Sequence, residues 1–311
     1  MPEAPRTHAE SPPVVGLGEL IWDMLPEGRR LGGAPSNFAY VSRLLGAEAA
    51  VASRVGRDAL GAEAVERLDR AGLSTRHIQL DEEHPTGTVG CTVGEGGEAH
   101  FNVNQNSAWD YLEWTSGWEG LAASAGVVCF GTLGQRHPAA RATVLRFLEA
   151  TPGTALRLFD VNLRHSFFTP DMLARSLGLA TVVKLNEEEL TTAAAMLNLS
   201  VPGASGARET AAALLGRFRL RLVAVTRGAR GSLLVSGEGA DEHAGFRARV
   251  VDTIGCGDAF AAALAHCLRR GAPLALSNEV ANRVGAWVAT QPGATPEADP
   301  ATVARLLGGL G

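Results

Sequence analysis

Short apolar runs alternate with amphipathic segments along most of the chain. We predict strands at residues 14–22, 49–55, 127–131, 156–161, 181–185 and 222–226, each followed by a segment able to form a helix. Residues 36–45, for example, have helical periodicity and end at Gly46, a favourable helix stop. Buried runs that alternate with helices are typical of βαβ units. We therefore predict an α/β fold with a mostly parallel central sheet and helices on both faces.

Two stretches, at about residues 22–32 and 86–104, interrupt this alternation. They contain several glycines and little helical pattern, which predicts short strands. We expect them to form a small β-sheet lid on one main domain, residues 14–311. Residues 1–13 are polar and proline-rich without the apolar stretch of a signal peptide, so we expect a disordered tail there.

Charge and composition narrow the possible partners. The formal net charge is -5, which disfavours nucleic acid as a partner. The apolar runs are too short to span a membrane. The four cysteines form no CxxC pair and no zinc-ligand spacing, which indicates reduced thiols and a cytoplasmic location. An anionic substrate must then be bound by local features such as glycine loops and helix N-termini.

The most informative segment is residues 251–260, VDTIGCGDAF, which precede a strong helix former. Gly255 and Gly257 permit a loop whose backbone N–H groups surround an anion at a helix N-terminus. Asp258 lies in the first turn of that helix, where a carboxylate can accept a proton from an attacking hydroxyl. The same string also fits an ordinary strand–turn–helix junction.

A second glycine-rich segment is residues 31–39, LGGAPSNFA. The paired glycines allow a ligand to approach the backbone closely. Asn37 offers both a donor and an acceptor to a sugar hydroxyl, and Asp23 can accept hydrogen bonds from two adjacent hydroxyls. The alternative is a simple turn in which Asn37 caps the next helix.

Three other enzyme classes fit the sequence poorly. The GxxxxGK[ST] motif of P-loop kinases is absent from the sequence. No GxGxxG follows the first predicted strand, which disfavours a Rossmann dehydrogenase. The string GASG at residues 203–206 does not match the GxSxG of serine hydrolases.

Together the strings GGAPSNFA and DTIGCGDAF resemble the two signatures of the PfkB (ribokinase-like) carbohydrate kinase family. The strings GELIWDMLPEG, DVNLR, KLNEEEL and VTRGARGS are most similar to bacterial fructokinases. The resemblance implies a ribokinase-like fold and ATP-dependent phosphorylation of a sugar hydroxyl, with fructose as the first expectation. Cys256 departs from the family, which usually has Ala there. A thiol at a helix N-terminus predicts a low pKa and sensitivity to oxidation.

The resemblance also implies roles for individual residues. Asp258 is expected to be the general base, and the backbone of Gly255, Cys256 and Gly257 the anion hole. The expected sugar ligands are Asp23, Gly32, Gly33, Asn37, Asn162, Arg164 and Asp258. Arg164 is also expected to neutralise charge on the transferred group; the alternative is a surface ion pair.

A third set is expected on the nucleotide side. ATP is expected to contact Lys184, Asn186, Thr226, Gly228, Gly231, Gly255, Gly257 and Asn282. Asn186 and Glu189 are expected to organise Mg²⁺ through water, but they also fit a helix capping pair. Lys184 fits a solvated surface position as well. A K⁺ ion near the late signature and a homodimer through the lid strands are further possibilities within the family.

The choice of acceptor stays open from sequence. Ribose, 2-keto-3-deoxygluconate and nucleosides are alternatives to fructose, as is a non-catalytic sugar-binding protein on the same fold. Residues 101–110 contain no Lys or Arg, which favours a neutral sugar over an acidic one. Phe101 or Trp109 would offer a nucleoside a stacking surface. Retention of Asp258 and its flanking glycines argues for an enzyme.

Overall fold

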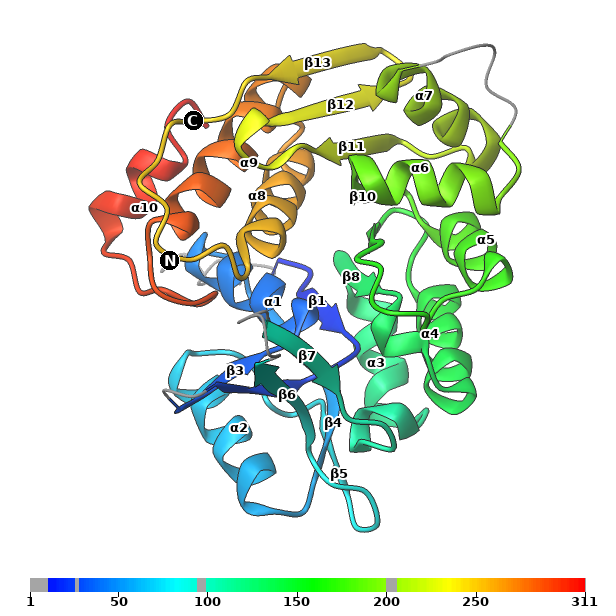
Figure 1. Ribbon diagram of the computed structural model, residues 1–311, viewed down its shortest axis with the longest axis vertical. Helices are drawn as coiled ribbons and strands as arrows, with labels where there is room; N and C mark the ends of the chain where they lie inside the picture. The colour runs from blue at the N-terminus through cyan, green and yellow to red at the C-terminus, as the bar shows by residue number, and fades with distance from the viewer. Residues whose placement is uncertain (1–10, 26–27, 94–98, 200–205, 311) are drawn as a thin grey trace, which may run out of the picture.

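The computed structural model describes residues 11–25, 28–93, 99–199 and 206–310. It forms an α/β body with a small sheet beside it (Figure 1). The strands are β1 (Val14–Leu17), β2 (Ile21–Leu25), β3 (Gly28–Gly32), β4 (Ala49–Gly56), β5 (Ile78–Asp81), β6 (Gly87–Val93), β7 (Ala99–Val103), β8 (Val127–Gly131), β9 (Leu156–Asp160), β10 (Val182–Asn186), β11 (Leu222–Thr226), β12 (Ser232–Ser236) and β13 (Gly239–His243). The α-helices are α1 (Ala34–Leu44), α2 (Ala59–Arg70), α3 (Ser116–Ser124), α4 (Pro138–Ala150), α5 (Pro170–Leu179), α6 (Glu187–Met196), α7 (Ala207–Phe218), α8 (Cys256–Arg269), α9 (Leu274–Ala289) and α10 (Pro300–Leu306).

The large sheet has the order β13-β12-β11-β10-β9-β8-β1-β4-β5. From β11 to β5 all neighbours are parallel, and β12 and β13 are antiparallel. The predicted mostly parallel sheet is therefore confirmed. Its inner strands are buried on both faces, which explains why they read as continuous apolar runs in the sequence, whereas the edge strands β5 and β13 are partly exposed.

Two apolar layers pack on opposite faces of this sheet. Successive side chains of a strand point to opposite faces, so Val15 and Leu17 join one layer while Val14 joins the other. The layer of Val15 includes side chains of α3, α4, α5, α6 and α7. The layer of Val14 includes side chains of α1, α2, α8, α9 and α10. In this second layer α8 packs between α1 and α9 (Figure 1).

The small sheet has the order β3-β2-β6-β7 and corresponds to the accessory strands expected from the sequence. The single strand expected at residues 14–22 is wrong in one respect, because the chain leaves the large sheet after β1 and enters the small sheet at β2. Gly18 makes this exit with φ +142°, a conformation that residues with a side chain rarely adopt. The domain boundary at residue 14 remains a prediction, and residues 1–10 of the expected tail lie outside the described residues.

A second difference concerns the segment after β11. A helix was expected there, but the chain forms the hairpin of β12 and β13, preceded by a single 3-10 turn at Gly228–Arg230. Gly231 permits this path, since a Cβ at that position would lie 1.9 Å from the carbonyl oxygen of His243. The hairpin supplies the antiparallel edge of an otherwise parallel sheet.

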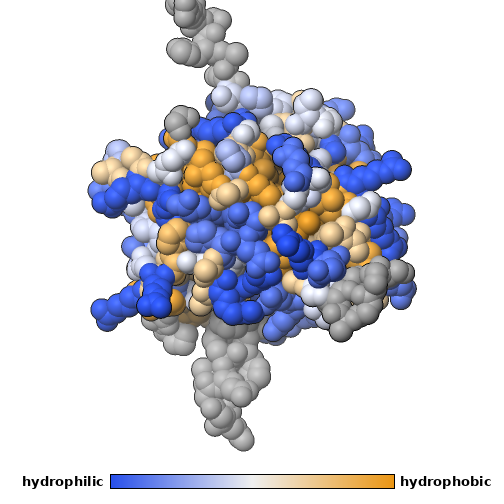
Figure 2. Space-filling view, turned by 90° about the horizontal axis from the view of Figure 1, so that it is seen from above, coloured by the Kyte–Doolittle hydropathy of each residue, from blue (hydrophilic) through white to orange (hydrophobic). Residues whose placement is uncertain are grey.

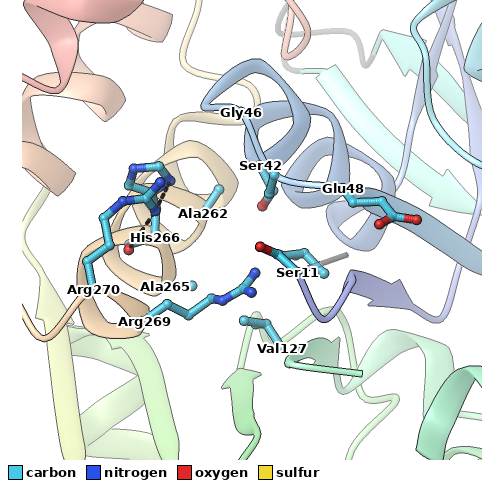
Figure 3. Close-up of a pocket in the computed structure, with 12 residues that line it drawn as sticks. Ser11, Ser42, Gly46, Glu48, Val127, Ala262, Ala265, His266, Arg269 and Arg270 are labelled. Carbon is cyan, nitrogen blue, oxygen red and sulfur yellow. Dashed lines mark hydrogen bonds between the residues drawn. The ribbon is translucent and has the colours of Figure 1, made fainter. Parts of the chain in front are cut away.

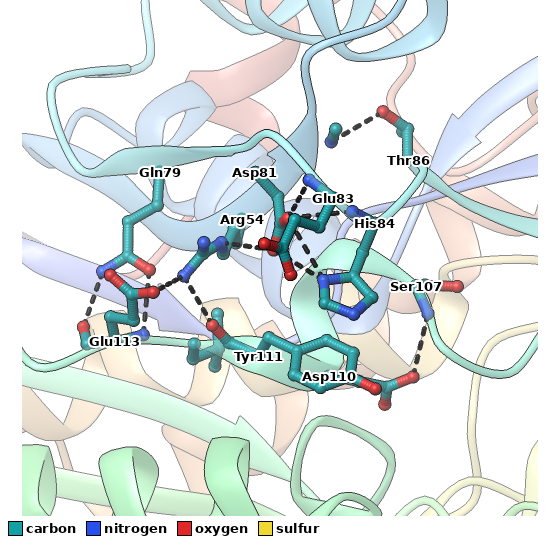
Figure 4. A network of polar contacts seen from close by, with 12 residues as sticks. Arg54, Gln79, Asp81, Glu83, His84, Thr86, Ser107, Asp110, Tyr111 and Glu113 are labelled. Atoms are coloured by element: carbon teal, nitrogen blue, oxygen red, sulfur yellow. Dashed lines mark hydrogen bonds and ion pairs between the residues drawn. The ribbon is translucent and has the colours of Figure 1, made fainter.

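A polar network ties the connection before the small sheet to the main body (Figure 4). Arg54 of β4 pairs with the buried Asp81 at 2.8 Å and with Glu113 at 2.6 Å. Asp81 also accepts the backbone N–H of His84, whose ring stacks on Tyr111 with 3.6 Å between centroids. These contacts fix the loop that leads into β6, one strand of the small sheet.

The described helices include none that is long and apolar enough to cross a membrane. The face shown in Figure 2 mixes hydrophilic side chains with smaller apolar areas. Trp109 and Trp118 are both buried in the core, so Trp109 does not offer the stacking surface considered for a nucleoside.

Candidate active site

The late glycine-rich segment forms the N-terminus of α8. Gly255 precedes the helix with φ 77° and ψ −4°, in the left-handed region. A Cβ at Gly255 would lie 2.3 Å from the Cβ of Ala294, so a side chain does not fit there. No side chain caps the helix, and the N–H of Cys256 makes only a long contact of 3.4 Å with the carbonyl of Thr253, so the first turn of α8 can bind an anionic ligand.

Asp258, in the first turn of α8, accepts a hydrogen bond of 2.8 Å from Asn37 Nδ2 of α1. This bond joins the two glycine-rich segments, although the residues are 221 positions apart in the chain. Burial and the nearby Asp160 carboxylate raise the pKa of Asp258 to about 6, against the opposing effects of Asn37, Lys184 and Arg164. The carboxylate is therefore more basic than an ordinary Asp yet largely ionised at neutral pH, which suits a general base.

Lys184 lies beneath the glycine loop and is buried, so the solvated alternative is wrong. Its Nζ is 2.9 Å and 3.0 Å from the two carboxylate oxygens of Asp160. Burial alone would lower the pKa of Lys184, but the Asp160 and Asp258 carboxylates raise it overall. A Cβ on Gly257 would lie 3.0 Å from Lys184 Nζ, so the ammonium supports the loop from below.

A cavity of about 680 Å³ opens in front of Asp258. The expected site residues that line it are Asp23, Gly33, Asn37, Asn162, Arg164, Lys184, Gly255, Gly257 and Asp258. Aliphatic side chains of the small sheet, such as Ile21 and Val103, and of loops of the main body, such as Leu163, complete its wall. We call it the acceptor cavity. Gly32 is not among its lining residues; a Cβ at Gly32 would lie 2.9 Å from Asp23 Oδ2, so this glycine leaves room for the Asp23 carboxylate.

A second cavity, of about 870 Å³, lies on the other side of the glycine loop. The expected nucleotide residues that line it are Thr226, Gly228, Gly231, Gly257 and Asn282, together with Cys256. Much of its wall is apolar, with Phe260 and Ala286 as examples. We call it the nucleotide cavity. The two cavities share Thr253 and Gly257, so two ligands can meet at the glycine loop.

The glycine loop is also tied to the small sheet. Asp252 Oδ2 accepts hydrogen bonds from Arg30 Nη1 of β3 at 3.0 Å and from the backbone N–H of Gly293 at 3.1 Å. Asp252 Oδ1 accepts the N–H of Ile254. Movement of β3 would therefore act directly on the loop before α8.

Cys256 does not have the low pKa expected from its position at a helix N-terminus. Burial and the Asp252 and Asp258 carboxylates raise the pKa of its thiol to about 11. The negative charges nearby outweigh the helix dipole, so the thiol stays protonated at neutral pH.

Asn186 and Glu189 form a reciprocal capping pair at the start of α6. The N–H of Glu189 donates to Asn186 Oδ1 and the N–H of Asn186 donates to Glu189 Oε2, both at 2.8 Å. Glu189 Oε1 also accepts the N–H of Leu163 at 2.9 Å, which anchors the loop that carries Arg164. Neither side chain is among those lining the two cavities, and the described residues contain no cluster of three metal-ligating side chains.

Arg164 is exposed and faces the acceptor cavity. It forms none of the ion pairs found within the described residues, so the surface ion-pair alternative is wrong. The left-handed backbone of Asn162, with φ 38°, turns this loop after β9. The guanidinium is therefore available to an anionic ligand.

Sequence reasoning missed Glu19. This residue lies between β1 and β2, is only 2% exposed, and lines the acceptor cavity. Burial, and to a smaller extent the Asp258 carboxylate, raise the pKa of Glu19 to about 7, although backbone N–H groups and Arg164 oppose the shift. The available signal was a charged residue inside the apolar run VVGLGELIW. Buried acidic residues are rare outside functional sites, so Glu19 was a candidate site residue.

Another pocket, of about 320 Å³, lies at the opposite ends of α1 and α8 (Figure 3). It is lined by Ser42, His266, Arg269 and Arg270, among others, and by none of the expected site residues. Burial and the two arginines lower the pKa of His266 to about 4, so the ring is neutral. We call it the distal pocket.

Comparison with known proteins agrees with this arrangement. Residues 27–301 match the protein family described as "pfkB family carbohydrate kinase". The fructokinase of Klebsiella pneumoniae is 32% identical over 263 residues, 80% of this chain and 81% of that protein. A putative sugar kinase of Pyrococcus horikoshii is 29% identical over 277 residues, 81% of each chain.

Solved structures show the same fold. The Pyrococcus horikoshii sugar kinase in complex with ATP has a TM-score of 0.77 and 26% identity, covering 94% of this chain and 97% of that one. Vibrio cholerae fructokinase with fructose, ADP and calcium has a TM-score of 0.78 and 24% identity, covering 96% and 99%. A Burkholderia thailandensis nucleoside kinase with inosine has a TM-score of 0.75 and 22% identity, covering 94% and 95%. The chain therefore belongs to the pfkB family of carbohydrate kinases.

Proposed function

We propose that this carbohydrate kinase transfers the γ-phosphoryl group of ATP to a hydroxyl of fructose. The observation that supports this most directly is the position of Asp258. Its carboxylate lines the acceptor cavity next to Gly257, which both cavities share, on the first turn of a helix that no side chain caps. A base and an anion-binding N-terminus side by side are what phosphoryl transfer to a hydroxyl requires.

In this mechanism the sugar occupies the acceptor cavity. Asp23 and Asn37 hold its hydroxyls, and Asp258 Oδ1 is free to orient and deprotonate the attacking one while Oδ2 stays bound to Asn37. ATP occupies the nucleotide cavity with its γ-phosphate at the glycine loop. The N–H groups of Gly255, Cys256 and Gly257, together with Arg164, stabilise the charge that develops on the transferred group.

Mg²⁺ would enter with the phosphates of ATP. The cation keeps several waters and prefers phosphate ligands, so an indirect contact with Glu189 is chemically suitable. Each Glu189 oxygen accepts one backbone N–H and retains a lone pair for such a water. Lys184 stays paired with Asp160 and supports the loop rather than reaching the phosphates.

The walls of the acceptor cavity favour a small neutral sugar. Its lining includes three carboxylic acids, Glu19, Asp23 and Asp258, against the exposed Arg164 and an ammonium already paired with Asp160. An acidic sugar would meet this excess of acid groups. Among the described lining residues there is no Phe, Tyr or Trp for a nucleoside base, and Trp109 is buried in the core; the side chain of Phe101 lies outside the described residues.

A coupled ADP-release assay tests the proposal. Fructose, ribose, 2-keto-3-deoxygluconate and adenosine are compared at saturating ATP and Mg²⁺, in potassium and in sodium buffer. We expect kcat/KM for fructose to exceed that of each other acceptor by at least about tenfold, a preference of 1.4 kcal/mol. A higher value for another acceptor would replace fructose by that compound, and sugar binding without ADP release would indicate a non-catalytic protein.

A homodimer through the small sheet also stays a proposal. Light scattering coupled to size exclusion measures the mass directly. A monomer at micromolar concentration would contradict it.

A further inference from the structure

Glu19 is a buried acid of the acceptor cavity to which the mechanism above gives no task. Its side chain lines the cavity, and its Oε2 atom is buried without a hydrogen-bond partner within the described structure. A buried polar oxygen left unpaired costs stability, and such atoms are rare in folded proteins. Such an atom in a residue that lines a ligand cavity is explained if the carboxyl turns on binding and the ligand supplies the missing hydrogen bond.

The surroundings of Glu19 leave space for its carboxyl group. A Cβ on Gly134 would lie 3.2 Å from Glu19 Oε2, so the absence of a side chain at Gly134 leaves the carboxyl uncrowded. Backbone N–H groups of Glu19 and Ala34 favour its ionised form, and Ala34 is the first residue of α1. The helix N-terminus therefore helps to hold the carboxyl in place.

A second unpaired oxygen lies in the same cavity. Asn37 donates through Nδ2 to Asp258, but its Oδ1 is buried without a partner among the described residues. Other buried unpaired hydroxyls, those of Ser42 and Ser53, do not line the acceptor cavity. Two residues that line one cavity therefore each have an unpaired acceptor oxygen, which matches a ligand that presents several hydroxyl groups.

A purely structural role for Glu19 explains less. Holding the start of α1 needs one carboxyl oxygen, and it leaves Oε2 unexplained. An apolar residue at position 19 would avoid the cost of burying an acid next to Asp258. The presence of a buried acid at this position despite its unfavourable burial indicates a function in ligand binding.

We propose that Glu19 binds a hydroxyl of the acceptor sugar other than the one that is phosphorylated, and so helps to determine which sugars are accepted. The inference rests on the proposed function, since it takes the acceptor cavity to hold a sugar. Asp258 remains the base, and Glu19 is a specificity residue.

The test compares Glu19→Gln and Glu19→Ala with Glu48→Gln as a matched control. Glu48 is exposed and lies before β4, at the opposite edge of the sheet, so it undergoes the same charge change away from the cavity. Melting temperature and circular dichroism establish that each variant is folded. Steady-state kinetics then give kcat and KM for fructose, for a series of monodeoxy-fructoses and for ATP.

We expect Glu19→Gln to raise the acceptor KM by about tenfold or more, the usual effect of losing a buried hydrogen bond to a charged group. The KM for ATP should stay within about twofold, and Glu48→Gln should behave like the wild type. For the one deoxy-fructose that lacks the contacted hydroxyl, wild type and Glu19→Gln should have the same kcat/KM.

Two results would overturn the inference. One is an acceptor KM in both Glu19 variants within twofold of the wild type. The other is an equal loss for every deoxy-fructose, which would assign Glu19 a structural role. If the wild type releases no ADP with any sugar, the proposed function fails first. In that case the rise in melting temperature caused by sugars is compared between the wild type and the Glu19 variants, and this comparison tests sugar binding by Glu19 independently of catalysis. A wild type that binds no sugar would overturn both the proposed function and the inference about Glu19.

Discussion

Helices α1 and α8 have a cavity at each end, and the two ends differ in chemistry. At the N-terminal ends, glycines precede both helices, and Asn37 and Asp258 lie in the first turns beside the acceptor cavity. At the C-terminal ends, the distal pocket is lined by Arg269 and Arg270. Arg270 there donates to the carbonyl of His266 in the last turn of α8, and both cations complement the negative end of the helix dipole, whereas no side chain caps the N–H groups at the other end.

The comparison teaches that packing alone does not make a site. Both ends are hollow, and both contain an ionisable group with a shifted pKa, the half-buried Asp258 at one end and the buried His266 at the other. The difference lies in the direction of the helix dipole and in the glycines that expose it. Substitutions at matched positions of the two ends can break or sharpen this contrast.

The largest effect is expected for Asp258→Asn. The variant keeps the shape of the side chain and can still accept the hydrogen bond from Asn37, but an amide cannot take a proton from the attacking hydroxyl. We expect kcat to fall by at least about a hundredfold with little change in sugar affinity. Coupled ADP release and sugar titration by calorimetry measure the two quantities, and near-normal turnover would remove Asp258 from the role of base.

A smaller effect is expected for Gly255→Ala. The new Cβ would lie 2.3 Å from the Cβ of Ala294, and the alanine would have to adopt φ 77°, which is unfavourable for a residue with a side chain. The loop, and the anion hole with it, must therefore shift. We expect kcat/KM to fall by about tenfold or more, together with a loss of about 1–3 kcal/mol in the free energy of unfolding.

Gly271→Ala is the matched control at the other end of α8. Gly271 has φ 66°, but a Cβ there would meet no atom within 4 Å. Backbone strain should lower the melting temperature while kcat/KM stays within about twofold. Equal losses of activity in the two variants would mean that strain, rather than the anion hole, explains the first result.

The pH dependence separates catalysis from stability at Asp258. Because the pKa of Asp258 is raised to about 6, kcat should fall as pH decreases through that value. The folded protein also binds this proton more tightly than the unfolded chain, whose Asp has its ordinary pKa of 3.8. Ionised Asp258 therefore lowers the free energy of unfolding, and the penalty grows between about pH 4 and 6 and is complete above.

Asp258→Asn should consequently melt at a higher temperature than the wild type at pH 7.5. The advantage should shrink as pH falls and disappear below about pH 4, because Asp258 is then protonated in both states. Thermal melts across this range measure the difference. A constant offset at every pH would show that burial of this charge is not the cause.

The smallest effect is expected for Arg269→Gln in the distal pocket. Arg269 donates to the carbonyl of Pro12 and lies in the last turn of α8, where a cation stabilises the helix by about 0.3–1 kcal/mol. The melting temperature should fall slightly, and kcat and KM should stay within about twofold. A larger change in kinetics would connect the distal pocket to the active site.

Apolar runs predicted the inner strands of the large sheet well because these strands are buried on both faces. Residues 127–131 and 222–226 form strands with the expected bounds. The same rule failed at 14–22, since both segments flanking Gly18 are apolar and nothing in the pattern marks the change of sheet. The rule also failed after β11, because the hairpin depends on the close approach of Gly231 to the backbone of His243 and Gly245, where a side chain would not fit.

The candidate site divides in a similar way. Family resemblance pointed to Asn37 and Asp258, and the structure brings them into contact. The electrostatic surroundings were not predictable, because they depend on residues distant in sequence. Asp160 pairs with Lys184, Asp252 and Asp258 act on Cys256, and Glu19 becomes a cavity residue only when β1 and α1 are packed.

The buried Lys184–Asp160 pair has a consequence for how related sequences can diverge. Loss of either partner alone would leave one uncompensated charge under the glycine loop, at a cost of about 3–5 kcal/mol. Replacing both together by apolar residues of similar volume avoids that penalty. Divergent homologues should therefore retain or exchange positions 160 and 184 as a unit, and an alignment rich in single replacements would contradict this coupling.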